Sequence, residues 1–195
     1  MTRSYAGAGR GGHLRRRTRL LARHRELNAR DPRIELCDIE MMERAIVLAR
    51  QAAAIGEVPV GAVVYRDGRI LAEAANNREA SSDPTGHAEL VAMRLAGRRL
   101  DAWRLQGCSV AVTLEPCPMC AGAMVNGRVG RLVYGASDPK AGACDTLYEI
   151  TTDTRLNHRL ETIGGVLEER CAGLLTEFFR RRRAERRRER RRSSA

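Results

Sequence analysis

Three potential metal ligands place the tightest constraint on how this chain of 195 residues can fold. Cys117 and Cys120 are three residues apart, a spacing that puts both sulfurs on one face at the start of a helix. His87 belongs to an earlier segment, His87-Ala88-Glu89, that is also expected to begin a helix. An imidazole and two thiolates are ligands that zinc favours, so we expect the fold to bring these two helix starts together.

Each part of this pattern has a simpler interpretation when it is taken alone. A Cys-x-x-Cys pair also occurs in redox sites and zinc ribbons, and a lone His is more often a buried core residue. A zinc ribbon needs a second close Cys pair, which the sequence lacks, and a redox pair has no need of His-x-Glu. Taken together, the residues predict a catalytic zinc with three protein ligands and a fourth position for water.

Glu89 is two residues beyond His87, and we expect it to transfer protons rather than to bind the metal. Zinc lowers the pKa of a bound water to roughly 7. A nearby carboxylate can then move protons between that water and a substrate nitrogen. A zinc-stabilised RNA-binding module without turnover would have no use for this carboxylate. His-x-Glu followed by Pro-Cys-x-x-Cys is typical of the zinc nucleobase deaminases.

Apolar patterns around these motifs predict helices alternating with short strands. Helices are expected over 39–55, after Asp83-Pro84-Thr85, over 117–125, and from 167 to about 183. Strands are expected over 60–65, 70–75, 110–114, 131–134 and 159–163, with Asp67-Gly68 as a hairpin turn between the first two. This alternation predicts an α/β sandwich around a mixed sheet.

Positive charge is concentrated at the two ends of the chain. The net charge is +11, and residues 1–36 and 177–195 each hold ten Arg and three acidic residues. We expect a basic, disordered N-terminal arm over 1–36, a zinc-dependent deaminase domain over 37–183 and an Arg-rich C-terminal tail over 184–195. Basic ends attract nucleic acid, although an Arg run can also be a solvated helix end.

Membrane and disulfide signals are both weak in this sequence. It contains no apolar run near 18 residues and no apolar signal-peptide core, so we expect no membrane partner. Only one pair among its six cysteines is closely spaced, which is unlike a disulfide framework. These features predict a protein of the reducing cytoplasm.

Longer stretches around the motifs resemble the bacterial tRNA-specific adenosine deaminases, a branch of the cytidine deaminase-like superfamily. These stretches are EVPVGAV (57–63), DPTGHAE (83–89), TLEPCPMCAGAM (113–124), LNHR (156–159) and Phe178-Phe179-Arg180. The resemblance runs from about residue 37 to about residue 183 and leaves out both basic ends. It implies an α/β fold, a three-layer α/β/α sandwich with a central mixed five-stranded sheet.

The same resemblance implies a specific reaction. It implies a homodimer in the bacterial cytoplasm that hydrolyses adenosine to inosine at the wobble position, position 34, of an arginine tRNA bound through its anticodon stem-loop. His87, Cys117 and Cys120 match the family's zinc ligands, one Zn²⁺ per subunit, and Glu89 matches its proton shuttle. Glu89 is expected to pass the proton of water to N1 of adenine and then to help the amino group leave as ammonia.

The resemblance also suggests residues that bind the substrate. Asn76 matches the asparagine that contacts the target base, with the neighbouring Asn77 as an alternative. Phe179 is expected to contact the substrate from the last helix. From their apolar character, Val58, Pro59 and Val60 are expected to form part of an apolar wall, with strand core as the alternative.

Asp138 and Lys140 fall in a segment that lies near the RNA in the family. Ser137 stands where the family often has an arginine, which puts one contact to the RNA backbone in doubt. Gly86 replaces a common alanine, a change from which we expect little effect.

The alternative enzyme is a deaminase of a free nucleoside, nucleotide or base, such as cytidine, dCMP or guanine, because it shares the zinc motif. The segment around Asn76, residues 156–159 and the basic last helix favour tRNA over these small substrates.

Overall fold

The computed structural model describes residues 18, 20–24, 26, 27 and 31–193. Within this part, a five-stranded sheet has the strand order β2-β1-β3-β4-β5. Its strands are β1 (Gly61–Arg66), β2 (Arg69–Ala75), β3 (Ser109–Leu114), β4 (Arg131–Ala136) and β5 (Glu161–Ile163). β1 pairs antiparallel with β2 and β3, whereas β3, β4 and β5 are parallel, so the predicted mixed sheet is confirmed.

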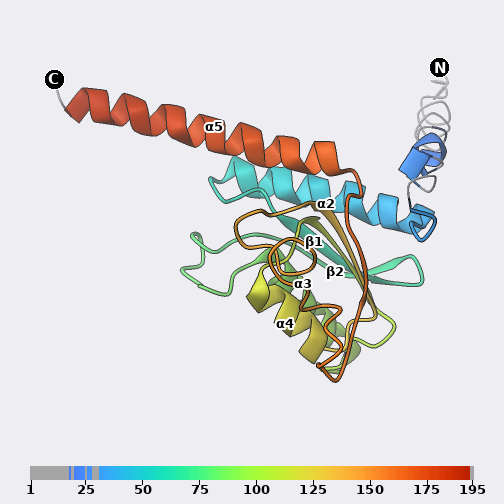
Figure 1. Cartoon of the computed structure of the whole chain (residues 1–195). Coiled ribbons are helices and arrows are strands. Elements are labelled where there is room, and N and C mark those ends of the chain that lie inside the picture. The colour runs from blue at the N-terminus through green and yellow to red at the C-terminus, as the bar shows by residue number, and fades with distance from the viewer. Residues whose placement is uncertain (1–17, 19, 25, 28–30, 194–195) are drawn as a thin grey trace, which may run out of the picture.

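Helices cover both faces of this sheet (Figure 1). α2 (Leu36–Ala54) and α5 (Glu168–Ser193) lie on one face, and α3 (Ala88–Leu100) and α4 (Pro118–Asn126) lie on the other. In β3, Val110 and Val112 join the core under α3 and α4, whereas Ala111 joins the core under α2 and α5. This alternation is what a strand buried on both faces requires, and it confirms the three-layer α/β/α sandwich.

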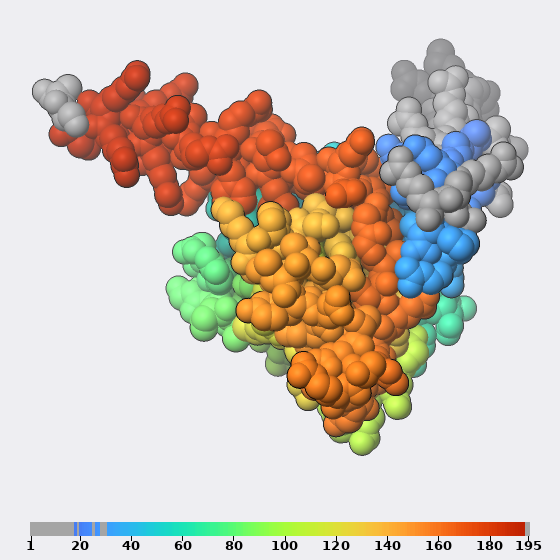
Figure 2. All heavy atoms as spheres, viewed as in Figure 1, coloured from blue at the N-terminus to red at the C-terminus, as the bar shows by residue number. Residues whose placement is uncertain are grey.

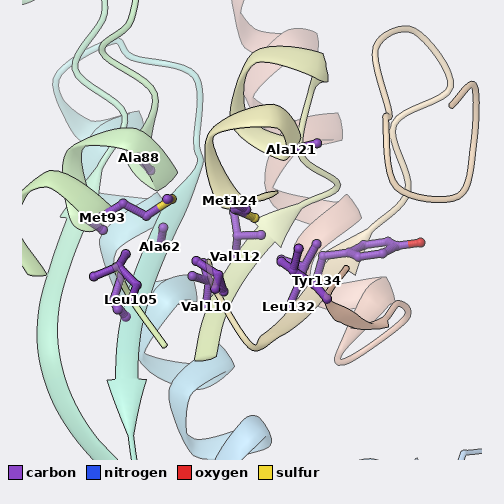
Figure 3. Close-up of a cluster of buried hydrophobic side chains, with 14 of the residues drawn as sticks. Ala62, Ala88, Met93, Leu105, Val110, Val112, Ala121, Met124, Leu132 and Tyr134 are labelled. Atoms are coloured by element: carbon purple, nitrogen blue, oxygen red, sulfur yellow. The ribbon is translucent and has the colours of Figure 1, made fainter. Parts of the chain in front are cut away.

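The core between the sheet and helices α3 and α4 fixes where these two helices begin (Figure 3). Ala88 and Ala121 are fully buried in this core, and each directly follows one of the predicted zinc ligands. Their small side chains allow each helix start to pack closely against the sheet. The packing of these alanines therefore helps to set the positions of His87 and Cys120.

The hairpin between β1 and β2 forms at the predicted Asp67-Gly68 turn. Both residues have positive φ angles, 49° for Asp67 and 70° for Gly68. Two consecutive left-handed residues are typical of a type I′ turn, whose twist matches that of the flanking strands.

α3 begins at His87, as predicted, a few residues after Asp83-Pro84-Thr85. Asp83 Oδ1 accepts hydrogen bonds from the backbone N–H of Thr85 (2.8 Å) and from the Thr85 hydroxyl (2.7 Å). The Asp83 side chain therefore stabilises a turn, and His87 occupies the N-cap position of the helix. Short polar side chains favour turns and helix caps for the same reason, so the sequence signal was ambiguous between the two.

The two basic ends differ in how much of them the structure describes. α5 runs without a break to Ser193, so residues 184–193 continue the helix, which projects beyond the body of the molecule (Figure 2). Near the other end, residues 18, 20–24, 26 and 27 are helical, and Leu20 and Leu27 pack against the core beside α2. The other residues before 31, together with 194 and 195, lie outside the described part, as does most of the predicted N-terminal arm.

The helices were also compared with the length and apolar character that a membrane span requires. No helix in the described part of the chain is both long enough and apolar enough to cross a membrane.

Candidate active site

Most of the predicted site residues gather at one edge of the sheet. β3 and β4 are parallel and end together, with Leu114 opposite Ala136. Since β1 runs antiparallel to β3, the segment before β1, which contains Val58 and Pro59, lies at the same edge. Asn76 follows the end of β2 and also lies there. The topology of the sheet therefore brings together four segments that are far apart in the sequence.

The three predicted zinc ligands meet at this edge. His87 is the N-cap residue of α3, Cys117 is the N-cap residue of α4, and Cys120 lies in the first turn of α4. His87 Nδ1 is 3.6 Å from Cys117 Sγ and 3.5 Å from Cys120 Sγ, and the two sulfurs are 3.7 Å apart. The two helix starts thus face one another with three donor atoms directed at a common point.

These distances fit a tetrahedral zinc. With Zn–S bonds of about 2.3 Å and Zn–N bonds of about 2.0 to 2.1 Å, tetrahedral angles separate two sulfurs by about 3.7 Å and a sulfur from a nitrogen by about 3.5 Å. The observed separations agree with both values. Among the described residues, no fourth His, Cys, Asp or Glu completes this group, so the protein offers three ligands.

The three groups also perturb one another's protonation. A hydrogen bond from the Cys120 thiol, supported by one from His87, outweighs burial and lowers the pKa of Cys117 to about 4. The hydrogen bond with Cys117 raises the pKa of His87 despite burial, and the same interaction with Cys117 raises the pKa of Cys120. A metal ion binds these groups in their deprotonated thiolate and imidazole forms, so it would displace the protons that they share here.

Glu89 is the second residue of α3 and is only 4% exposed. Burial raises the pKa of its carboxyl group, although hydrogen bonding and the charge of His87 offset part of this effect. Within the described part of the chain, no salt bridge involves Glu89. Burial raises the pKa of such a carboxyl group toward the range in which a general acid–base works.

Geometry distinguishes the two asparagines after β2. Asn76 is buried, and its Nδ2 donates a hydrogen bond of 2.9 Å to Glu57 Oε2. Because an ionised carboxylate only accepts hydrogen bonds, this contact fixes the orientation of the Asn76 amide. Glu57 is itself buried, and its Oε1 accepts the backbone N–H of Ala80 at 2.7 Å. Asn77 lacks such an anchor, since within the described residues its buried Oδ1 has no hydrogen-bond partner.

Gly86 matters more to this loop than the sequence suggested. It is buried, and a β-carbon at this position would lie 2.7 Å from Asn77 Oδ1 and 3.0 Å from Arg78 Cα. An alanine would therefore require the Asn77 side chain to move and the neighbouring backbone to give slightly.

The remaining predicted substrate residues differ in burial and in their position relative to the three converging ligands. Val58 is half-buried against the core under α3 and α4, and Pro59 is buried. Asp138 Oδ1 accepts the backbone N–H of Lys140 at 2.9 Å, and Lys140 is exposed. Phe179 is 44% exposed on α5, on the sheet face opposite α3 and α4, so it is not gathered with the cluster.

Two buried carboxylates at this edge received no role from the sequence. Glu57 orients Asn76, and Glu115, at the end of β3, accepts hydrogen bonds from the segment after β4. Glu57 directly precedes Val58, and Glu115 lies two residues before Cys117, both of which the sequence analysis named. An acidic residue next to a buried apolar strand is the only signal that could have drawn attention to them.

Comparisons with known proteins agree with this fold and site. A family model for MafB19-like deaminases matches residues 37–183, so the chain is a member of the deaminase class. A tRNA-specific adenosine deaminase of Bacillus subtilis is 48% identical over 139 residues, covering 71% of this chain and 86% of the relative. A second, from Haemophilus influenzae, is 46% identical over 144 residues, covering 73% and 83%. The chain belongs to the family of bacterial tRNA-specific adenosine deaminases.

A solved structure is similar as well. It comes from a study of A-to-I editing by tRNA:A34 deaminases at the wobble position of transfer RNA. It is 40% identical in sequence, with a TM-score of 0.68, and the match covers 70% of this chain and 99% of that one.

Proposed function

We propose that this chain is a zinc-dependent hydrolase that converts adenosine to inosine at the wobble position of a tRNA, with an arginine tRNA as its substrate. The observation that carries the proposal is the convergence of His87, Cys117 and Cys120 at zinc-binding distances, together with the buried carboxyl group of Glu89, which forms no salt bridge in the described part of the chain. A zinc site that only stabilised the fold would have a closed set of four ligands and no need of this carboxyl group.

His87, Cys117 and Cys120 would hold one zinc ion per subunit. When it is bound, zinc supplies the Lewis acidity that makes water nucleophilic at neutral pH. Glu89 would accept a proton from the attacking water and deliver it to N1 of adenine. The same carboxyl group would then protonate the amino group, so that one water is consumed and one ammonia is released.

The neighbouring residues would position the base. Asn76, its amide fixed by Glu57, would form hydrogen bonds with the purine, and Val58 and Pro59 would exclude water from its face. An anticodon loop presents unstacked bases, so the cost of bringing the target base into such a pocket is low.

The charge of α5 supports a polyanionic substrate. Residues 180–193 of this helix are exposed and consist mainly of Arg. Exposed guanidinium groups attract phosphates, and we propose that they, Lys140 and Phe179 contribute to binding tRNA around the site.

We also propose that the protein acts as a homodimer in the bacterial cytoplasm. Leu95, Trp103 and Met119, all on or beside α3 and α4, are large exposed apolar side chains, as a protein interface requires. All six cysteines are free thiols, which is compatible with a reducing compartment.

The deciding experiment compares kcat/KM for an anticodon stem-loop with kcat/KM for free adenosine, cytidine and guanine. We expect efficient deamination of the stem-loop and almost none of the small substrates, because phosphate contacts remote from the base help to orient C6. Similar values, or a preference for a free base or nucleoside, would assign the chain to the alternative branch of deaminases while retaining the zinc chemistry.

A further inference from the structure

The carboxylate of Glu115 lies at the centre of a set of hydrogen bonds. Glu115 is 2% exposed, and its Oε1 accepts the backbone N–H groups of Cys144 (3.1 Å), Asp145 (2.9 Å) and Thr146 (2.9 Å). Its Oε2 accepts the backbone N–H of Asp138 (3.0 Å) and the hydroxyl of Thr146. Five donors from one loop therefore saturate the acceptor capacity of a single carboxylate.

The loop in question is irregular and needs such an acceptor. Residues 137–160 connect β4 to β5 without a helix or strand of their own. Buried backbone N–H groups in irregular segments must find acceptors outside regular secondary structure. Hydrogen bonds to an ionised acceptor are stronger than those between neutral groups, so Glu115 can hold the loop where a neutral side chain would hold it less firmly.

The loop is closely wrapped around this carboxylate. Gly142 has no room for a β-carbon, which would contact the Glu115 carboxylate and lie 2.6 Å from the Asp138 carbonyl oxygen. The backbone N–H of Ala143 donates to the carbonyl of Pro116 at 2.9 Å. Since Glu115 and Pro116 directly precede Cys117, the loop is attached to the segment that leads into a proposed zinc ligand.

The outer side of the same loop presents side chains suited to single-stranded RNA. Lys140 is exposed between the anchors at Asp138 and Cys144. Leu147 and Tyr148, which directly follow the anchor at Thr146, are 50% and 57% exposed. A cation for phosphate and an aromatic ring for base stacking are the usual means of binding single-stranded nucleic acid. Figure 2 shows this segment, in amber to orange, on the face turned toward the viewer.

We infer that Glu115 is a positioning residue for RNA: it holds the loop over 138–148 so that Lys140 and Tyr148 contact the anticodon loop while the base enters the zinc site. This inference rests on the proposed function. It assigns Glu115 no contact with the metal or the substrate, because its carboxylate is already fully engaged. The change expected on its removal is therefore in RNA binding rather than in the chemical step.

The test uses Glu115→Gln in the full chain, which keeps the shape of the side chain but places an NH₂ group against N–H donors. The dissociation constant for an anticodon stem-loop, measured in a Glu89→Ala background that cannot turn over, should rise about tenfold, the equivalent of one or two lost hydrogen bonds. KM should rise in parallel in the active enzyme, with kcat within about twofold of the unmodified value and zinc content unchanged.

Two further variants test whether the effect of Glu115→Gln comes from the position of the loop. One controls for the loss of charge, and the other disturbs the same interaction more mildly. Glu149→Gln removes the same charge from the same loop at an exposed side chain, and it should leave both constants within about twofold. Thr146→Val removes one of the five donors at an exposed position and should weaken binding about two- to threefold. In Glu115→Gln, the Thr146→Val change should have no further effect, because both act on one interaction.

Several results would overturn the inference. They are a loss of zinc, a fall in kcat with unchanged KM, no change in binding, or an equal effect of Glu149→Gln. The proposed function is tested separately by the unmodified chain. If that chain neither binds nor deaminates the stem-loop, both ideas fail together. If it does so and the Glu115 and Thr146 variants match it, the inference alone fails.

Discussion

Charged side chains on the α2/α5 face of the sheet are paired with one another, whereas the buried carboxyl group beside the proposed zinc ligands forms no ion pair in the described part of the chain. On the first face, the fully buried Asp38 accepts hydrogen bonds from Tyr65 Oη (2.5 Å) and Arg131 Nη2 (2.7 Å). Glu43 forms a bidentate ion pair with Arg170, which ties α2 to α5. At the site edge, Glu89 is nearly as buried but belongs to no ion pair among the described residues.

The difference separates charges that stabilise the fold from the carboxyl group for which we propose a role in proton transfer. Desolvating a charge is costly, and on the α2/α5 face hydrogen bonds and opposite charges offset that cost. At Glu89 no ion pair among the described residues offsets this cost, and burial raises the pKa of its carboxyl group. A protein tolerates such a group where proton transfer requires it, and this is why perturbed titratable groups cluster at functional sites. Variants on the two faces should therefore affect different properties.

The largest effect is expected for Glu89→Ala. Turnover of the stem-loop should fall by about 10²–10⁴-fold, because a single carboxyl group serves several proton transfers. The fold and the zinc content should be unchanged, since Glu89 is not among the three convergent ligands. Single-turnover kinetics together with metal analysis provide the measurement, and loss of zinc from this variant would show that Glu89 is a ligand instead.

On the opposite face, Asp38→Asn should act on stability alone. It removes the buried charge that faces Arg131, and breaking one side of a buried pair costs about 3–5 kcal/mol. Urea unfolding should show this loss in the free energy of unfolding, whereas kcat of the folded enzyme at low temperature should stay within about twofold of the unmodified value. A large fall in kcat without loss of stability would contradict the division between the faces.

Glu43→Gln should give a smaller, pH-dependent effect. Burial tends to raise the pKa of Glu43, but the hydrogen bond and charge of Arg170, with help from Arg23, lower it overall. A carboxyl group whose pKa is depressed on folding stabilises the protein above its unfolded pKa of about 4.3, and this stabilisation is lost as the pH falls through the folded pKa. We expect the variant to lose about 1 kcal/mol at pH 7.

Repeating the unfolding measurements over a range of pH distinguishes loss of the ion pair from loss of packing. The difference in unfolding free energy between the Glu43→Gln variant and the unmodified protein should shrink as the pH is lowered below the unfolded pKa. A difference that stays constant over the whole series would mean that packing, rather than the ion pair, explains the loss.

The smallest effect is expected from removing residues 184–195. These residues include the Arg run from Arg186 to Arg192, which lies beyond the body of the molecule on α5. At low salt, affinity for the stem-loop should fall about two- to fivefold, and the slope of log Kd against log salt should decrease because fewer counterions are released. An unchanged slope would mean that this run is a solvated helix end.

Much of the fold was predictable because its signals are local. Short apolar runs predicted the five strands, and the Asp67-Gly68 turn predicted the hairpin. The helix start at His87 was also predictable, and Asp83 and Thr85 form the turn that precedes it. Phe179 stays a predicted substrate residue, and the sequence did not show that α5, which carries it, packs on the face of the sheet opposite α3 and α4. No local pattern reports which face of a sheet a helix covers.

The sequence by itself determined the chemistry of the site. Two thiolates and an imidazole, with a carboxylate two residues from the imidazole, predict zinc and proton transfer because these properties belong to the residue types and their short spacing. Tertiary structure decided the surroundings of each carboxylate. Glu89 and Glu115 each lie within two residues of a proposed zinc ligand, yet in the described part of the chain Glu89 is buried without an ion pair and Glu115 accepts five hydrogen bonds. That distinction depends on donors contributed by a loop some thirty residues away, and only folding brings them to the carboxylate.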